Sequence, residues 1–331
     1  MSQRISFLVV FIVIWSSIAL HGQDLVFSQY QKSPLLLNPG FAGVSPYPIF
    51  TVNYRNQWPQ LDNAYVSYAA SYNQYFPSVR SGLGVQVTSD VQADGIIKQN
   101  SLGLYYSYTL EFAGDNFMKL GLGGTFGQTS LDWNRLVFAD QIDRINGPDG
   151  SLSSTEVAPT DLSSGYFDIS TGFLFYNKKW FLGLGLFHLN TPNIGFSLNT
   201  DISSGNPLRY SLHGGYQIDL WDTKDNDAAF IQPMVLFTRQ AEFTQLNVGV
   251  ASQFSSILLG VFYRHSVVQN QDAVIGWLGY QFDLIELTYS YDYTVSQLNG
   301  SGGSHEIGVV FDLEAVLPPR SKLNDCLKLF R

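Results

Sequence analysis

The segment LIELTYSYDYT, Leu284–Thr294, alternates between apolar and polar side chains along its whole length. Side chains at every second position of a β-strand point to the same face. One face of this strand would carry Ile285, Leu287, Tyr289, Tyr291 and Tyr293, and the other Glu286, Thr288, Ser290, Asp292 and Thr294. Such a strand separates an apolar surrounding from a polar one.

The same alternation recurs along the chain, for example in SLGLYYSYTLEF (101–112), TQLNVGVA (244–251) and HEIGVVFDL (305–313). We count about fourteen such segments, an even number as in bacterial membrane barrels. The third and the ninth have the weakest pattern, the ninth because Pro233 lies inside it. The segments are expected to begin near Phe50, Ala64, Leu83, Ser101, Phe117, Phe167, Trp180, Leu208, Phe230, Thr244, Ile257, Ala273, Ile285 and His305.

Composition separates two all-β folds that share this alternation. In a soluble sandwich the polar face meets water, whereas in a membrane barrel it lines the interior. Only 14% of residues are charged, against about 25% in an average soluble domain, and 15% are aromatic. The polar faces are rich in Gly, Ser, Thr and Asn. The sequence therefore predicts an all-β, transmembrane outer-membrane β-barrel of about 14 antiparallel strands over residues 49–313.

The lengths of the connections predict the topology of this barrel. The longest, Gln128–Gly165, is the fifth connection, and the next longest, Thr191–Pro207, is the seventh. Even-numbered connections such as YNKK (176–179) are short, with WDTKDND (221–227) as a mild exception. Bacterial barrels have short periplasmic turns and long outer loops. We therefore expect the long connections outside the cell and both chain ends in the periplasm.

The ends of the chain carry separate signals. Arg4 followed by an apolar run from Ile5 to about Leu20 is typical of a secretory signal peptide, which we assign to residues 1–23. Its removal would change the formal net charge from −9 to −10, because it contains one arginine and no acid. No basic patch is present, so nucleic acid is not expected as a partner. Residues 314–331 are expected to form a periplasmic tail.

Residues 24–48 lie between the signal peptide and the first strand. Within them, QKSPLLLNPGFAG (31–43) has neither helical nor strand periodicity, and Pro34 and Pro39 preclude a regular helix through it. Its leucines and aromatic residues are too apolar to remain in water. We expect this N-terminal segment to plug the periplasmic half of the lumen, or to cap that mouth.

No pattern of catalytic or ligand-binding residues emerges. GLGGTFG (121–127) lacks the lysine of a phosphate loop, and His188 has no second ligand at metal-binding spacing. His305 and Glu306 are adjacent, so a strand would direct them to opposite faces. The acids Asp140, Asp143 and Asp149 lack calcium-loop spacing, and nothing marks Cys326 as a nucleophile. We predict a protein that is not an enzyme and has no cofactor or metal.

The opening of the predicted mature chain, DLVFSQYQKSPLLLNPGFAGV (24–44), resembles the start of the PorP/SprF family. Further matches are YRNQWP (54–59), FHLNTPN (187–193) and SHEIGVVF (304–311). The ending NDCLKLFR departs from the family's Cys-Pro-aromatic ending, and Gly40 stands where members often have alanine. The matching residues at the start are Phe27, Ser28, Gln29, Asn38, Pro39, Gly40, Phe41 and Gly43.

The resemblance implies an accessory outer-membrane barrel of the type IX secretion and gliding machinery of Bacteroidetes. Its partners would be outer-membrane lipid and either a secreted surface protein, such as a large adhesin, or periplasmic secretion-ring components. We therefore expect a docking protein, with a passive or selective pore for small solutes as the alternative. The candidate residues for a plug or partner contact are Phe27, Ser28, Gln29, Tyr30, Leu36, Asn38, Pro39, Gly40, Phe41 and Gly43.

Overall fold

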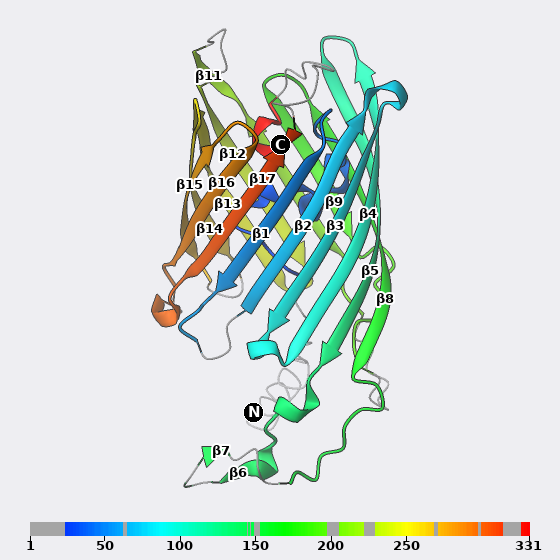
Figure 1. Cartoon of the computed structure of the whole chain (residues 1–331), viewed down its shortest axis with the longest axis vertical. Helices are drawn as coiled ribbons and strands as arrows, with labels where there is room; N and C mark the ends of the chain where they lie inside the picture. The colour runs from blue at the N-terminus through cyan, green and yellow to red at the C-terminus, as the bar shows by residue number, and fades with distance from the viewer. Residues whose placement is uncertain are drawn as a thin grey trace, which may run out of the picture.

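In the computed structural model the chain forms a closed antiparallel β-barrel with tilted strands (Figure 1). The predicted signal peptide, residues 1–23, lies outside the described residues. The structure describes residues 24–61, 65–143, 145, 147–148, 153–196, 205–221, 229–267, 271–296, 299–313 and 326–331.

Fourteen strands make the wall, so the fold class predicted from the sequence is confirmed. They are β1 (Ile49–Gln57), β2 (Tyr65–Phe76), β3 (Ser81–Gln92), β4 (Ile97–Phe112), β5 (Asn116–Leu131), β8 (Ser163–Tyr176), β9 (Trp180–Phe187), β10 (Arg209–Tyr216), β12 (Ala229–Gln240), β13 (Phe243–Phe254), β14 (Ile257–Ser266), β15 (Ala273–Gln281), β16 (Ile285–Thr294) and β17 (Ser304–Asp312). Each pairs with its neighbours in sequence, and β1 closes the barrel against β17.

Short elements complete the fold. The four-residue strand β11 (Ile218–Trp221) continues the course of β10, and β6 (Ile142–Asp143) pairs with β7 (Gly147–Pro148) in the fifth connection. Helical turns are η1 (Tyr30–Lys32), α2 (Pro34–Leu37), η2 (Pro39–Phe41), η3 (Pro77–Val79), η4 (Ala93–Gly95), η5 (Trp133–Arg135), η6 (Ala139–Gln141), η7 (Asn299–Ser301) and η9 (Lys328–Phe330). No helix among the described residues is long and apolar enough to cross a membrane.

Pro233 explains why β10 and β11 are separate. The registers of the two pairs, Gly215 opposite Met234 and Ile218 opposite Ile231, place Pro233 opposite the last residue of β10. Proline has no N–H to donate, so the ladder is interrupted at this position. On the β9 side the pairing continues, because the Gln217 N–H donates to the Lys179 carbonyl.

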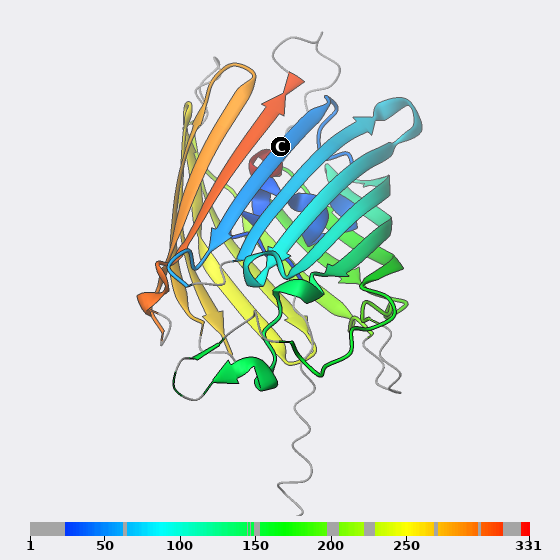
Figure 2. The same ribbon diagram turned by 60° about the horizontal axis from the view of Figure 1, so that its bottom comes forward.

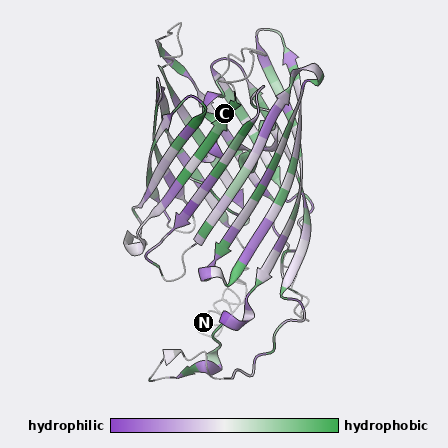
Figure 3. Cartoon of the chain, in the orientation of Figure 1, coloured by the Kyte–Doolittle hydropathy of each residue, from purple (hydrophilic) through white to green (hydrophobic). Residues whose placement is uncertain are grey.

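Each strand has the two faces that the sequence predicts. In β16 the apolar positions are exposed or half-buried, whereas the intervening polar positions are all buried toward the interior. Tyr289 is 45% exposed, while Ser290 is fully buried. The alternation is visible along the strands in Figure 3. The outer surface is the apolar band that lipid requires.

The two ends of the barrel differ in the length of their connections. At one end, hereafter the short-connection end, adjacent strands are joined by residues 113–115, 177–179, 255–256 and 282–284. The opposite, long-connection end carries the connections 132–162 and 188–208, and the described part of the former, which includes β6 and β7, projects far from the wall (Figure 1). The strands β4, β5 and β8 also extend further than predicted, so the fifth connection is shorter than Gln128–Gly165.

The outward face of β16 tests the barrel directly. Tyr289→Arg, near mid-strand, should lower the free energy of unfolding by about 2–4 kcal/mol, whereas Tyr293→Arg, near the long-connection end, should cost about 0–1 kcal/mol because the interface is wet. Unfolding by urea in lipid vesicles measures both. Equal costs at the two depths would contradict a lipid-facing band.

Candidate functional site

The lumen is occupied by the chain's own N-terminal segment, residues 24–48. Figure 2 shows its helical turns inside the barrel. From the start of β1 the segment runs backward through the lumen, from the short-connection end past Phe41 to Asp24 beside the ends of β9 and β12. It therefore reaches beyond the half of the lumen that the sequence predicted.

Glycines in the wall let the segment lie directly on the strand backbones. A methyl group at Gly121 would overlap Pro39 and Gly40, and one at Gly82 would overlap Ala42. Gly172 likewise leaves room for Asn38. These lumen-facing glycines form a smooth track on β3, β5 and β8, which is the close backbone approach that glycine permits.

The Asn-Pro-Gly turn fixes the segment to this track. The Asn38 side chain accepts from the Gly40 N–H (2.7 Å) and donates to the Phe173 carbonyl (2.9 Å). Gly43 adopts φ +64°, which only glycine adopts readily, and a side chain there would overlap Gly82. The Asn73 side chain pairs with the Gly43 N–H and the Phe41 carbonyl.

A cluster of buried apolar side chains, hereafter the apolar cluster, lies in the lumen toward the short-connection end. Phe41, fully buried, stacks on Phe330 of the C-terminal tail with ring centroids 4.5 Å apart. Tyr30 meets Phe262 edge to face, with centroids 6.0 Å apart. The described tail residues, 326–331, thus lie inside the lumen, and Gln232 Nε2 donates to the carbonyl of Cys326 (2.8 Å).

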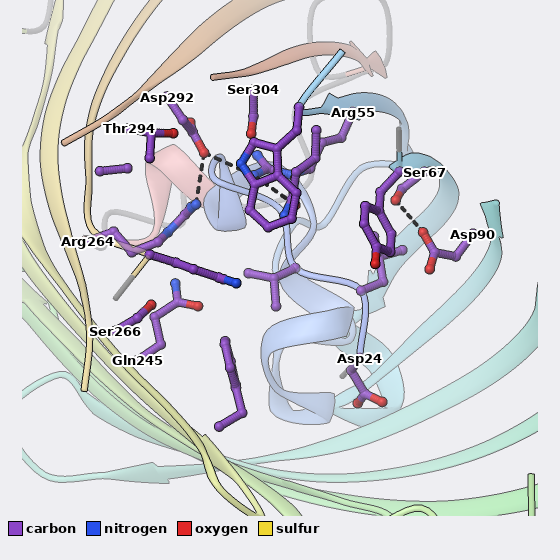
Figure 4. Close-up of a pocket in the computed structure, with 18 of the residues that line it drawn as sticks. Asp24, Arg55, Ser67, Asp90, Gln245, Arg264, Ser266, Asp292, Thr294 and Ser304 are labelled. Atoms are coloured by element: carbon purple, nitrogen blue, oxygen red, sulfur yellow. Dashed lines mark hydrogen bonds and ion pairs between the residues drawn. The ribbon is translucent and has the colours of Figure 1, made fainter. Parts of the chain in front are cut away.

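A buried network of charges holds the segment at Ser28. Arg55 lies 3.0 Å from Asp292 and 3.2 Å from Glu306, and Arg264 lies 2.8 Å from Asp292. Ser28 Oγ donates to Asp292 (2.6 Å) and accepts from Arg264 (2.7 Å). Figure 4 shows the two arginines converging on Asp292.

Glu306 is the acceptor that ties the segment's backbone to the wall. It accepts the Ser28 N–H (2.8 Å) and the Gln29 N–H (3.0 Å), and Gln29 Nε2 also donates to Ser290 (3.1 Å). A second ion pair, Lys32 to Glu286 (2.6 Å), follows one turn further along. Buried charges are costly unless paired, so the wall and the segment stabilise each other here.

Asp24 is held by a second cluster at the long-connection end. Its carboxylate lies 2.6 Å from His188 Nε2 and 3.0 Å from Arg209, and Asn206 and Gln240 also donate to it. Burial alone would lower the pKa of His188. The carboxylates of Asp24 and Asp168 outweigh it and raise that pKa to about 9, so His188 is a cation at neutral pH. Burial opposes ionisation of Asp24, yet His188 and Arg209 hold its pKa below the usual value.

Between the N-terminal segment and the long-connection end, the lumen contains a polar cavity of about 320 Å³. Its floor includes residues 24–26, and its walls include Arg55, Arg264, Gln245 and Asp90, which Figure 4 places around the opening. Ser67 donates to Asp90 (2.5 Å) at one side. The charges that line this cavity are largely paired with one another, so it offers hydrogen bonds rather than net charge.

The structure places all ten candidate residues of the sequence analysis in the lumen. Nine are buried, and Leu36 is half-buried with its carbonyl accepting from Arg209 Nη2 (2.8 Å). They do not form one contact surface. Ser28 and Gln29 join the charge network, Tyr30 and Phe41 join the apolar cluster, and Asn38 lies on the glycine track.

Sequence reasoning missed the charged partners. The sequence places Asp292 on the polar face of its strand, but it does not connect Asp292 or Glu306 with Arg55 and Arg264. Charges of opposite sign on inward positions of β1, β14, β16 and β17 were the available signal. His188 is a lumen residue with carboxylate partners, and no cluster of three metal-binding side chains occurs among the described residues.

Fold and lumen together define an outer-membrane β-barrel that contains its own N-terminal segment. A family model described as type IX secretion system membrane protein PorP/SprF matches residues 19–311. The chain therefore belongs to the PorP/SprF family and is located in the outer membrane. That family is not known as a family of enzymes.

Other comparisons are more distant. No curated protein matches the chain. Among solved structures, Omp33 of Acinetobacter baumannii is 8% identical over 82% of this chain and 99% of its own, with a TM-score of 0.44. The toluene transporter TbuX of Ralstonia pickettii is 8% identical over 85% and 92%, with a TM-score of 0.46. A porin variant of Rh. blastica is 9% identical over 80% and 99%, with a TM-score of 0.34.

The role of Glu306 can be tested with its neighbour in sequence as the control. Glu306→Gln removes one of the two carboxylates that pair with Arg55 and can point an amide donor at the Ser28 and Gln29 N–H groups. It should cost about 2–5 kcal/mol and expose residues 24–30 to protease. His305→Gln changes an outward-facing side chain and should do neither. Unfolding in vesicles and limited proteolysis measure the two effects, and similar results for both variants would refute the anchor.

The Asp24 cluster predicts a pH dependence. Because the pKa of folded His188 is raised to about 9, its stabilising ion pair is complete below about pH 6.5 and is lost as the pH rises through 9. A spin label at Val26→Cys, in a Cys326→Ser background, should therefore gain mobility between these values. His188→Gln should remove that transition. A transition that persists in His188→Gln would show that another group causes it.

Proposed function

We propose that this protein is a non-enzymatic outer-membrane barrel that docks a secreted or surface partner, or the secretion complex itself, in type IX secretion. Membership of the PorP/SprF family supplies the secretion context. The observation that carries the proposal is the filled lumen, because a barrel obstructed by a bonded segment is suited to holding partners rather than passing solutes.

Fourteen strands would otherwise leave space for water, since barrels of about 8 strands are filled by wall side chains and those of about 16–18 form channels. Here the N-terminal segment and the tail occupy much of that space. The contacts of the segment begin at Asp24, and those of the tail extend to Arg331, whose Nε donates to the Val44 carbonyl (2.8 Å). A solute pore would need this whole set of contacts to be released.

The two ends of the barrel offer different surfaces for a partner. At the long-connection end, the described part of residues 132–162 projects from the wall and presents exposed apolar side chains, among them Val157, 84% exposed. At the short-connection end, the N-terminal segment and the tail meet at the mouth. A secreted surface protein fits the former, and a secretion-ring component fits the latter if that end faces the periplasm.

A steric wedge in the wall tests the plug without altering the segment. Gly121→Val should expel Asn38–Gly43, because the new side chain would overlap Pro39 and Gly40. Single-channel conductance in planar bilayers should rise. Gly124→Val is the matched control, because an added methyl group there would first meet the Phe167 ring at 3.4 Å.

Export of surface proteins by cells that carry these variants tests the function. Deletion of Phe27–Gly43 and Gly121→Val should both impair it, while Gly124→Val should not. An open barrel with normal export would make the segment a tether only. Unchanged conductance and unchanged export would reject both the plug and the docking role.

A further inference from the structure

One stretch of the barrel wall has a strand neighbour on only one side. β8 pairs with β5 along Ser163–Tyr176, but its pairing with β9 covers only Thr171–Tyr176. Beyond β9, the Leu189 N–H donates to the Ile169 carbonyl (3.0 Å), and Asn190 Nδ2 donates to the Phe167 carbonyl (2.7 Å). Residues 163–166 and the N–H of Phe167 lie past these contacts.

The direction of the free backbone groups follows from Ile169. Both its N–H and its carbonyl point to the β9 side, toward Asn190 and Leu189. Because direction alternates along a strand, the backbone groups of Ser163, Gly165 and Phe167 point the same way. Among the residues that the structure describes, none pairs with the Ser163 and Gly165 groups or with the Phe167 N–H.

This edge is accessible. Ser163, Gly165 and Phe167 are all exposed, Phe167 by 55%, and a methyl group added at Gly165 would meet nothing closer than 3.7 Å. β8 has fourteen residues, while about 9–11 suffice to cross a bilayer. The edge therefore lies where the strand leaves the lipid, and Figure 1 shows β8 extending toward the projecting connection.

We propose that this edge, Ser163–Phe167, binds an extended strand of the docked partner by β-augmentation; this rests on the proposed docking function. Unpaired main-chain donors and acceptors in a row are complementary to another extended backbone, and side chains at alternate positions then give specificity. The partner strand would be antiparallel or parallel to β8 and about five residues long, the length of the free edge.

The surroundings indicate the charge of that strand. The connection 132–162 contains six acidic residues and two arginines, a net charge of −4. Arg135 forms an ion pair with Asp94 (2.5 Å). The Asp140 carboxylate accepts hydrogen bonds from Ser154 and Thr155, which links the two arms of the connection. Asp161, two residues before the edge, and Glu156 in the same connection are exposed. The occupant is therefore a strand with lysine or arginine at its ends.

Gly165 offers a variant that removes the edge and spares the barrel. Its N–H points away from β5, so Gly165→Pro deletes a free donor and no bond of the wall; strands tolerate proline at such an edge position. Gly165→Ala keeps the N–H and is the control. Heat-modifiable migration on gels confirms that each variant is folded.

The binding assay uses the full chain in lipid nanodiscs and a fluorescent peptide, Lys-Thr-Val-Thr-Val-Thr-Lys, with a glutamate-ended version as the comparison. The lysine peptide should bind more tightly than the glutamate peptide. Its affinity should fall about tenfold in Gly165→Pro, the change expected for one or two lost hydrogen bonds, and stay unchanged in Gly165→Ala. Equal affinity for both variants, or preference for the glutamate peptide, would overturn the proposal.

A cell assay separates this proposal from the docking function on which it rests. A strain lacking the protein is complemented with wild type, Gly165→Pro or Gly165→Ala, and surface-retained exported protein is measured. Loss in Gly165→Pro alone supports the edge. Full rescue by Gly165→Pro in a strain that needs the protein rejects the edge and keeps the function. A strain without any defect rejects the docking function, and with it this partner site.

Discussion

In lipid, no water is present to satisfy the main chain, so every N–H and carbonyl that crosses the bilayer needs a partner in the protein. The closed ladder of fourteen strands meets this requirement, with β1 pairing to β17 as the last seam. The period of two follows, because each strand divides its side chains between lipid and lumen. Pro233 shows what happens where a backbone donor is missing: it lies opposite the end of β10, and the hydrogen-bond ladder is interrupted there.

The same constraint creates a problem in the interior. A wall of fourteen strands is too wide for its own side chains to fill, and the chain uses both ends to occupy the space. Glycines at Gly82, Gly121 and Gly172 bring the segment onto the backbone, while the tail supplies Phe330 against Phe41. The charged residues Arg55, Asp292, Arg264 and Glu306 then join the wall to Ser28 and Gln29.

The wall was largely predictable, because a strand with one face toward lipid and the other toward the lumen alternates apolar and polar residues in sequence. Strands predicted to begin at Ile257, Ala273 and Ile285 begin at those residues. β4 and β8 begin four residues earlier than predicted, because strand pairing continues past the lipid into water, where apolar alternation ends. The contacts in the lumen were not predictable. Asp24 and His188 are 164 residues apart in sequence, and only the closed barrel brings them within 2.6 Å.

The position of Glu306 has a consequence for how the chain folds. It lies on β17, the final strand, and accepts the N–H groups of Ser28 and Gln29 near the chain's other end. Until β17 pairs with β1, the N-terminal segment lacks this acceptor; until the segment arrives, closing the seam would bury Glu306 with two of its partners missing. Closure of the seam and occupation of the lumen are therefore thermodynamically coupled, so an empty closed barrel and an open loaded sheet are both disfavoured intermediates.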